Sequence, residues 1–296
     1  MKTEPGRVIG MQSLTLSSPA KLNLRLDVLG KRSDGYHDLL MLMERINLED
    51  EIEIRVVEKA LCVNCDDPSI PDGEGNIVFR AVKEILAYSS RNVGVEVSIK
   101  KRIPVASGMG GGSSNAATVI KGVNQLLKLK LPREKLMMIG AKLGADVPFF
   151  LFEGPAIASG IGDQLRKIKK IPKMTFAIIN PGIPVSTEWV YKNLGINGNG
   201  HNGHKLEEVP SAFNTKRDVV KVLNNDLEKV TIKEYPVIAE IKKLLLSHGA
   251  LASQMTGSGP TVFGIFPDKA ILDKALSKIE NRMDRRWKSF RAENLC

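Results

Sequence analysis

The feature that most constrains this chain is a glycine-rich segment near its middle. Residues 104–115 read Pro-Val-Ala-Ser-Gly-Met-Gly-Gly-Gly-Ser-Ser-Asn and lead into a stretch with helical spacing at Val119, Val123 and Leu126. Glycine has no Cβ atom, so such a backbone can curl and aim successive N–H groups at one anion. The helix that follows adds its positive dipole end and its free amides. This order of elements predicts a phosphate-binding loop.

The loop is not one of the common phosphate-binding motifs. A Walker loop would need Lys-Ser/Thr after Gly112, where this chain has Ser113 and Ser114. The dinucleotide fingerprint would need glycine or alanine in place of Ser113, and the protein-kinase motifs are absent. The alternative is a tight turn without a ligand, but loop closure alone needs one or two residues with positive φ rather than four glycines.

The rest of the chain predicts a mixed α+β fold. Apolar alternation predicts strands, and helical spacing predicts helices. The strands are expected at 22–28, 52–56, 93–99 and 174–179, and the helices after Asn76, from Pro132, at 187–194, at 236–247 and from Asp268. Gly144 and Gly249 are expected to end helices in the left-handed conformation. Strands and helices do not alternate regularly, which favours α+β over a doubly wound sheet and places a domain boundary near residue 160, between residues 1–160 and 161–296.

Composition narrows the function classes. The chain has 296 residues, of which 43% are hydrophobic and 26% charged, as in globular proteins. It has no apolar run long enough to span a membrane and no secretory signal, so a cytoplasmic protein without a membrane partner is expected. Cys62 and Cys65 lack a second cysteine pair, which favours two free thiols in a turn-rich stretch over a metal site. The net charge of +10 suits nucleic acids and phosphorylated metabolites alike.

Three segments of the chain resemble the three motifs of the GHMP kinases, in the same order. They are Pro19-Ala-Lys21-Leu-Asn23, Gly108–Ser114 and Thr256–Pro260. Two further segments, Asp34-Gly-Tyr36-His37 and Gly144-Ala-Asp146-Val-Pro148, narrow the resemblance to the branch of the family whose acceptor carries a cytidine diphosphate group. It covers roughly residues 14–266, and several motifs in register are much more specific than any one of them.

The sequence departs from the family pattern in three places. Met109 replaces a leucine that is common in the loop, Tyr191 stands where phenylalanine is usual, and the Gly195–Pro210 stretch is longer. Gly195–His204 is expected to be the most flexible loop of the chain. These departures concern contacts with the substrate rather than the reaction.

The resemblance implies a two-lobed α+β fold, with an N-terminal ATP-binding lobe, a C-terminal lobe and the active site between them. The implied reaction is ATP-dependent phosphorylation of the 2-hydroxyl of 4-diphosphocytidyl-2-C-methyl-D-erythritol, a step of non-mevalonate isoprenoid precursor biosynthesis. Mg²⁺ is expected with ATP, without an identified protein ligand. No metal site built by the protein itself is predicted, and the sequence leaves the oligomeric state open.

The resemblance also implies roles for individual residues. Asp146 would accept or orient the acceptor's hydroxyl proton, and Lys21 would stabilise phosphate charge; the alternative is a structural ion pair. The residues implied for the nucleotide are Asn76, Lys101, Pro104, Val105, Ala106, Ser107, Gly108, Met109, Gly110, Gly111, Gly112, Ser113 and Ser114. Asn76 could instead cap a helix, and Lys101 could instead be a solvated strand end.

Five residues are implied on the acceptor side: Asn23, Tyr36, His37, Thr187 and Tyr191. The two tyrosines would stack on the cytosine, and His37 would read its polar edge. Tyr36 and His37 could instead form an ordinary turn, and Thr187 could cap its own helix. Thr256–Pro260 would close over the phosphates, or be a plain hairpin turn.

Two rival functions remain at this stage. Another GHMP kinase, of the mevalonate or homoserine type, is disfavoured by Tyr36, His37 and the Lys21/Asp146 pair. A basic RNA-binding protein is disfavoured because it leaves the glycine loop unexplained and needs aromatic or arginine-rich platforms, whereas only 5% of the residues are aromatic. No nucleic-acid partner is therefore expected.

Overall fold

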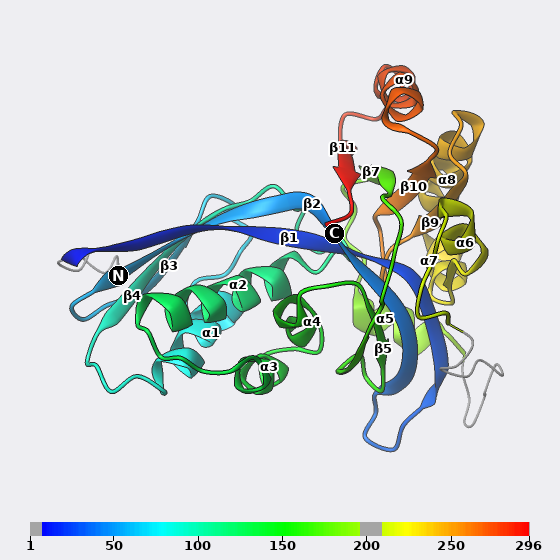
Figure 1. Ribbon diagram of the computed structural model, residues 1–296. Helices are drawn as coiled ribbons and strands as arrows, with labels where there is room; N and C mark the ends of the chain where they lie inside the picture. Colours follow the sequence, from blue (N-terminus) through cyan, green and yellow to red (C-terminus); the bar gives the residue numbers. More distant parts are fainter. Residues whose placement is uncertain (1–7, 196–208, 296) are drawn as a thin grey trace. The chain divides into compact units, whose positions relative to one another are not determined.

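The computed structural model describes residues 8–195 and 209–295 (Figure 1). The chain divides into two compact units. Unit 1 comprises Met1–Ala20, Glu49–Val105 and Gly110–Glu153, and unit 2 comprises Lys21–Leu48, Ala106–Met109 and Gly154–Cys296. The combination of helices with one mixed and one antiparallel sheet confirms the α+β prediction. The units are interleaved along the chain, and the lobe boundary at residue 160 stays a prediction.

Unit 1 is a sheet with helices packed on it. Its strands are the first part of β1 (Val8–Lys31), the second part of β2 (His37–Val57), β3 (Leu61–Cys65) and β4 (Gly94–Lys100). Its helices are η1 (Gly73–Gly75), α1 (Ile77–Leu86), α2 (Gly111–Leu126), α3 (Arg133–Ala141) and α4 (Val147–Phe152). β4 pairs antiparallel with β2 and parallel with β3. Figure 1 shows the four α-helices together beside this sheet.

Unit 2 contains two groups of strands. The first consists of the remaining parts of β1 and β2 together with β5 (Ala156–Ser159), β6 (Gln164–Lys167) and β8 (Asn224–Asn225). The second is a four-stranded antiparallel sheet in the order β11 (Lys288–Glu293), β7 (Thr175–Asn180), β10 (Val262–Phe266), β9 (Ala252–Met255). Its helices are α5 (Thr187–Asn193), α6 (Lys216–Lys221), α7 (Glu228–Glu234), α8 (Val237–Ser247) and α9 (Lys269–Glu280). Every residue of the central strands β7 and β10 is buried, because α8 and α9 pack on this sheet.

The structure confirms most of the predicted elements and corrects others. Asn76 caps α1 as predicted, and the helix expected from Asp268 is α9, which Asp268 caps. Gly249, with φ +97°, follows α8. The prediction for Gly144 is wrong: α3 ends at Ala141, and Gly144 has no positive φ. The turn-rich stretch expected around Cys62 and Cys65 is instead strand β3, and both thiols are free. Most of the predicted flexible loop, from residue 196 onward, lies outside the described residues.

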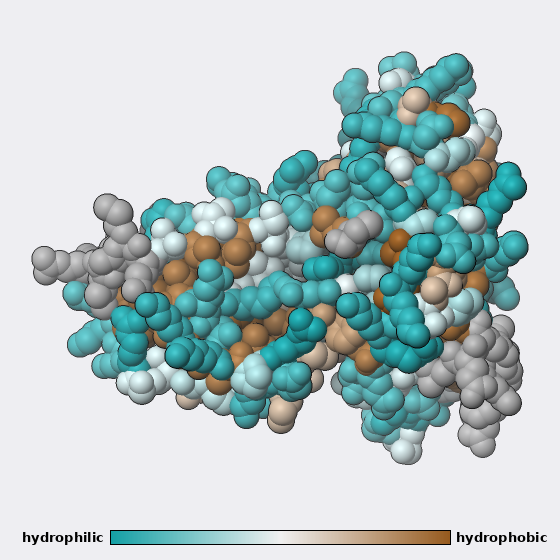
Figure 2. All heavy atoms as spheres, in the orientation of Figure 1, coloured by the Kyte–Doolittle hydropathy of each residue, from teal (hydrophilic) through white to brown (hydrophobic). Residues whose placement is uncertain are grey.

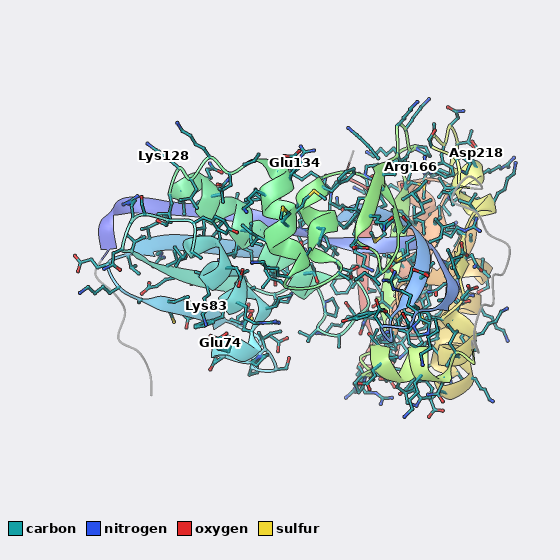
Figure 3. All side chains as sticks on the ribbon, turned by 90° about the horizontal axis from the view of Figure 1, so that it is seen from below. Glu74, Lys83, Lys128, Glu134, Arg166 and Asp218 are labelled. Carbon is teal, nitrogen blue, oxygen red and sulfur yellow. The ribbon has the colours of Figure 1, made fainter. Side chains whose placement is uncertain are left out.

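The surface carries many charged residues in opposite-sign pairs. In Figure 3 Glu74 and Lys83 lie together, and their ion pair measures 2.7 Å. Hydrophilic residues (teal) cover most of the face drawn in Figure 2, and hydrophobic ones (brown) show in separate areas. Across residues 8–195 and 209–295, no helix has the length and apolar character needed to cross a membrane.

Candidate active site

Three sequence motifs meet within unit 2. The backbone N–H of Lys21 donates to the carbonyl oxygen of Met109 at 2.9 Å, and the N–H of Asn23 donates to Thr256 Oγ1 at 2.9 Å. The glycine loop also packs directly on the Thr256–Pro260 loop. A Cβ atom on Gly108, where φ is +76°, would lie 2.4 Å from the carbonyl oxygen of Thr256. Only glycine allows this approach of one backbone to another.

The Thr256–Pro260 loop joins β9 to β10, so the hairpin connection weighed for it is present. The Thr256 N–H donates to the carbonyl oxygen of Thr261 at 2.9 Å across the loop. The hydroxyl of Thr187 shares a 2.7 Å hydrogen bond with that of Ser258. Ser186, not Thr187, caps α5, so the alternative role of Thr187 as a helix cap is wrong. Thr187 instead contacts the loop.

Lys21 and Asn23 lie on the same face of β1, as the alternation of the strand predicts. Lys21 Nζ donates to Asn23 Oδ1, and the two residues are 4% and 0% exposed. Asn23 Nδ2 also lies 3.3 Å from the sulfur of Met41. A buried ammonium group is costly unless polar partners surround it, so this position of Lys21 is typical of a functional site.

The predicted acceptor residues form an aromatic pair in unit 2. The rings of His37 and Tyr191 are stacked, with centroids 5.0 Å apart and 30° between their planes. Burial and the nearby charge of Lys31 lower the pKa of His37, which favours its neutral form. Tyr36 is 61% exposed and lies in a turn, where its N–H donates to Asp34 Oδ1 at 3.1 Å. His37, rather than Tyr36, is thus the ring that pairs with Tyr191.

In unit 1, the start of α2 has the geometry of an anion site. Gly110 precedes the helix in the left-handed conformation (φ +70°, ψ +20°), and its position supplies no side-chain cap. The first amides of a helix need partners from outside it, and phosphate is a favoured one. Along the loop, Ala106, Gly108 and Gly110 have φ of +51°, +76° and +70°. Alternate residues with positive φ form the concave arrangement of N–H groups that binds anions. The residues present therefore fit a nucleotide phosphate.

A buried carboxylate holds the segments on either side of this loop. Asp50 of β2 is 1% exposed. Its Oδ1 accepts from the N–H groups of Arg102 and Ile103 at 2.7 and 2.9 Å. Its Oδ2 accepts from Asn115 Nδ2 at 2.9 Å and from Lys101 Nζ. Residues 101–103 precede the loop and Asn115 follows it, so one side chain ties both ends together.

This arrangement places several of the predicted nucleotide residues. The Lys101 side chain is 8% exposed and ion-paired with Asp50, so its alternative as a solvated strand end is wrong. The Ser114 hydroxyl accepts from Ser18 Oγ at 2.8 Å inside the unit, whereas Ser113 is half-buried. Asn76 uses its side-chain oxygen to cap α1 at the N–H of Val78. The nucleotide contacts of these residues stay predictions.

Asp146 occupies the position before the first residue of α4 and is half-buried in unit 1. The preceding turn is closed by a 3.2 Å hydrogen bond from the N–H of Val147 to the carbonyl oxygen of Gly144. Asp146 belongs to unit 1 and Lys21 to unit 2. The catalytic roles of both residues stay predictions.

Sequence reasoning missed Asp50, although its position carried a signal. In β2, Ile46, Leu48, Ile52 and Ile54 share the buried face with Asp50. A carboxylate at one position of an otherwise apolar face is unlike a solvated charge and needs buried partners. Its partners are distant in sequence and could not be inferred from that pattern.

Comparisons with known proteins identify the family of the chain. The family model described as GHMP kinases N terminal domain matches residues 76–154, and that described as GHMP kinases C terminal matches residues 212–285. A relative from Pelobacter propionicus, named 4-diphosphocytidyl-2-C-methyl-D-erythritol kinase, is 50% identical over 91% of this chain and 95% of its own. Both chains are thus matched over nearly their whole length.

Solved structures show the same fold. A crystal structure of 4-(cytidine 5'-diphospho)-2C-methyl-D-erythritol kinase matches with a TM-score of 0.77 and 26% identity, over 95% of this chain and 99% of the other. A homoserine kinase from Cytophaga hutchinsonii matches with a TM-score of 0.69 and 18% identity, over 99% and 97% of the two chains. The second likeness concerns the fold alone. The two family-model matches and the similarity over nearly the whole chain lead to one conclusion: this chain belongs to the GHMP kinase family.

Proposed function

We propose that this chain transfers the γ-phosphate of ATP to the 2-hydroxyl of 4-diphosphocytidyl-2-C-methyl-D-erythritol. The observation that carries the proposal is the 50% identity, over 91% of the chain, to a kinase named for this substrate. The phosphate-binding geometry at the start of α2 supports the nucleotide part. The stacked His37 and Tyr191 rings support the acceptor part. A cytoplasmic location stays a prediction.

The nucleotide phosphates would lie against the glycine loop. The amides that begin α2 and the loop N–H groups would compensate the negative charge, a task that dominates phosphoryl transfer. Mg²⁺ is expected as the partner of ATP. Within the part of the chain that the structure describes, no three His, Cys, Asp or Glu side chains are grouped to hold a metal. Mg²⁺ commonly uses one or two protein carboxylates plus substrate phosphates.

The acceptor would be oriented through its cytosine ring. Cytosine offers a flat face and a polar edge, and aromatic side chains bind such faces with about 1–3 kcal/mol per stacked base. Tyr191 and His37 already lie parallel enough to present such a face in unit 2. Because the reacting hydroxyl lies far from the base, this contact energy would serve to position the substrate.

For the chemical step, the Asp146 carboxylate would take the proton of the acceptor hydroxyl. The hydroxyl oxygen then forms a bond to the γ-phosphorus, the bond from that phosphorus to the bridging oxygen breaks, and ADP leaves with that oxygen. The Lys21 ammonium group would stabilise the charge that develops on the transferred phosphate.

We expect Asp146→Asn to lower kcat by roughly 10² while ATP affinity changes little, because the variant keeps the shape of the side chain but loses the base. Single-turnover kinetics together with calorimetric titration of ATP separate the two effects. An unchanged kcat would reassign Asp146 to a structural role.

Phosphorus NMR of the wild-type protein with Mg·ATP tests the proposal itself. The panel of acceptors contains 4-diphosphocytidyl-2-C-methyl-D-erythritol, the same methylerythritol phosphate without its cytidylyl group, mevalonate and homoserine. We expect a new phosphomonoester signal with the first compound alone. Equal turnover of an acceptor that lacks the cytidine would return the assignment to a GHMP kinase of another specificity. RNA binding that survives moderate salt, without ATP binding, would favour the nucleic-acid alternative.

A further inference from the structure

A short polar segment forms hydrogen bonds with the Thr256–Pro260 loop and with the strand that enters it. It consists of Asn224–Glu228, from β8 into the start of α7, and is called the 224–228 clamp here. Its central residue is Asn225, which is 6% exposed. Asn225 Nδ2 donates to the carbonyl oxygens of Met255 and Gly257 at 2.8 and 2.9 Å. Its Oδ1 accepts from the N–H of Leu227 at 3.1 Å. The amide therefore holds both the loop, at Gly257, and the last residue of β9 before it, Met255.

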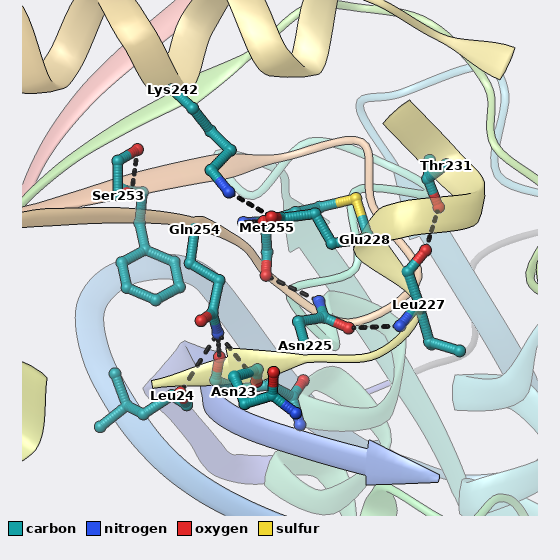
Figure 4. A network of polar contacts seen from close by, with 12 residues as sticks. Asn23, Leu24, Asn225, Leu227, Glu228, Thr231, Lys242, Ser253, Gln254 and Met255 are labelled. Atoms are coloured by element: carbon teal, nitrogen blue, oxygen red, sulfur yellow. Dashed lines mark hydrogen bonds and ion pairs between the residues drawn. The ribbon is translucent and has the colours of Figure 1, made fainter. Parts of the chain in front are cut away.

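Glu228 holds the same loop from the other end of the clamp. Its Oε2 accepts from the N–H of Met255 at 2.8 Å, and its Oε1 forms an ion pair with Lys242 of α8 (Figure 4). One turn along α7, Thr231 approaches the loop at Gly259, where an added Cβ atom would lie 3.5 Å from Thr231 Cγ2. The clamp thus holds Met255 and Gly257, and Thr231 of α7 borders Gly259.

The clamp is fixed to strand β1 as well. The Val28 N–H donates to Asp226 Oδ2 at 2.8 Å, and Asn224 Nδ2 donates to Asp27 Oδ1 at 2.6 Å. Gln254 completes the connection in Figure 4: its Nε2 donates to the carbonyl oxygens of Leu24 and Asn224, each at 3.2 Å. The clamp therefore joins the loop to the strand that carries Lys21 and Asn23.

The loop needs such support because of its own composition. Gly257 and Gly259 adopt positive φ, of +58° and +94°, and glycine backbone is the most flexible in the unfolded and partly ordered chain. A loop that must present its backbone to a phosphate has few side chains to fix its conformation. Residues that fix it from a neighbouring element therefore preorganise the site.

We infer that Asn225 is a positioning residue for ATP binding, acting through its hydrogen bonds to Gly257 of the Thr256–Pro260 loop and to Met255, the last residue of β9 before it. The inference rests on the proposed function, in which this loop closes over the nucleotide phosphates. In this role Asn225 would act through the loop and not by contact with a substrate. Substitution of Asn225 would leave the glycine loop unchanged and would loosen only the neighbouring Thr256–Pro260 loop.

The test compares Asn225→Ala with Asn294→Ala. Asn294 is a matched control: it is also 6% exposed and in unit 2, its Oδ1 accepts from the N–H of Met174 at 2.7 Å, and its Nδ2 donates to the Pro172 carbonyl oxygen at 3.1 Å. Both variants lose buried hydrogen bonds, so both should lose stability. Calorimetric titration with Mg·ATP should show Kd raised roughly tenfold for Asn225→Ala and within about twofold of wild type for Asn294→Ala.

Each result has one reading. If Asn225→Ala binds ATP as wild type does, or if Asn294→Ala weakens binding equally, the positioning role is wrong. If wild type itself fails to bind ATP, the proposed function fails instead. Should Asn225→Ala not fold, Asn225→Asp keeps the volume and the acceptor for the Leu227 N–H but loses donors to the loop. It should also raise the Kd for ATP, and an unchanged Kd in that variant overturns the inference.

Discussion

The two units each bury a carboxyl group, and they surround it in opposite ways. Asp50 of unit 1 is 1% exposed and accepts hydrogen bonds from Arg102 N, Ile103 N, Asn115 Nδ2 and Lys101 Nζ. Glu44 of unit 2 is 0% exposed and accepts from the N–H of Arg45 at 2.9 Å. Its Oε2 has no hydrogen-bond partner among the described residues. Burial raises the pKa of Glu44 to about 8, against smaller opposing effects of Arg45 and Asn294.

The difference shows how each unit supports its part of the candidate site. Unit 1 fixes both ends of the glycine loop through the Asp50 carboxylate, which also forms a buried ion pair with Lys101. In unit 2, the neutral amide of Asn225 contacts the Thr256–Pro260 loop itself, at the carbonyl oxygen of Gly257. Buried charges are costly to disrupt, whereas neutral amides cost less for each lost contact. The two supports should therefore respond differently to substitution and to pH.

The largest effect is expected for Asp50→Ala. The variant leaves Lys101 without its buried partner and two backbone N–H groups without an acceptor, so we expect a loss of about 3–5 kcal/mol in the free energy of unfolding. Urea unfolding measures it. The control is Asp66→Ala, which removes an exposed acceptor of the Lys101 N–H at 2.9 Å and should cost less than about 1 kcal/mol. Equal losses in both variants would show that the buried Asp50 contributes no more to the free energy of unfolding than an exposed carboxylate.

The next effect concerns pH. The pKa of Glu44 in the folded chain, about 8, lies above its ordinary value of 4.5, so the folded state holds a proton that the unfolded state releases. The stabilising contribution is complete below pH 4.5 and is lost as the pH rises through 8. We expect stability to fall by roughly 3–5 kcal/mol over that window.

Unfolding curves of wild type and Glu44→Gln between these pH values measure this dependence. The variant has no ionisable group at the site, and its stability should lack this part of the pH dependence. A wild-type profile identical to that of the variant would show that the pKa of Glu44 is not raised in the folded chain, and would remove the contrast with Asp50.

A smaller effect is expected for the aromatic pair of unit 2, which should act on the acceptor and not on ATP. His37→Ala and Tyr191→Ala should each lower kcat/KM for the cytidine substrate, because each removes one ring of the stacked pair. The expected loss corresponds to about 1–3 kcal/mol of transition-state stabilisation. ATP affinity should stay close to that of wild type. The control is Tyr88→Ala in unit 1, which removes an aromatic ring that lies under Lys135. If the control lowers kcat/KM equally, the aromatic pair does not bind the acceptor.

The elements of the fold could be predicted where a local pattern decides them. The alternation in residues 22–28 and 52–56, the cap at Asn76 and the glycine after α8 each act within a few residues. The prediction of a left-handed conformation at Gly144 was wrong because a glycine after a helix permits that conformation without requiring it. The prediction of a turn-rich stretch around Cys62 and Cys65 was wrong because the polar residues nearby suggested turns. The pairing of β3 with β4, which makes the segment a strand, leaves no local pattern in the sequence.

The candidate site could be predicted only as far as its motifs reach. The glycine loop was predicted because its residue types carry the chemistry, and the resemblance to the family implied His37 and Tyr191; the ligand contacts of all of them stay predictions. The Asp50 network and the 224–228 clamp were not, since their members act through partners far along the chain, such as Asn225 with Gly257 and Asp50 with Asn115. The contact of Gly108 with Thr256 likewise depends on the tertiary fold.

The central claim is that the glycine loop binds the nucleotide phosphates, and Gly110→Val tests it most directly. Gly110 has φ +70°, which a β-branched side chain strongly disfavours, and the added methyl groups would stand where the backbone must approach a phosphate. Titration calorimetry with Mg·ATP should show Kd raised about tenfold or more, equivalent to about 1.4 kcal/mol. A folded Gly110→Val protein that binds ATP with wild-type affinity would contradict the assignment of the phosphate site.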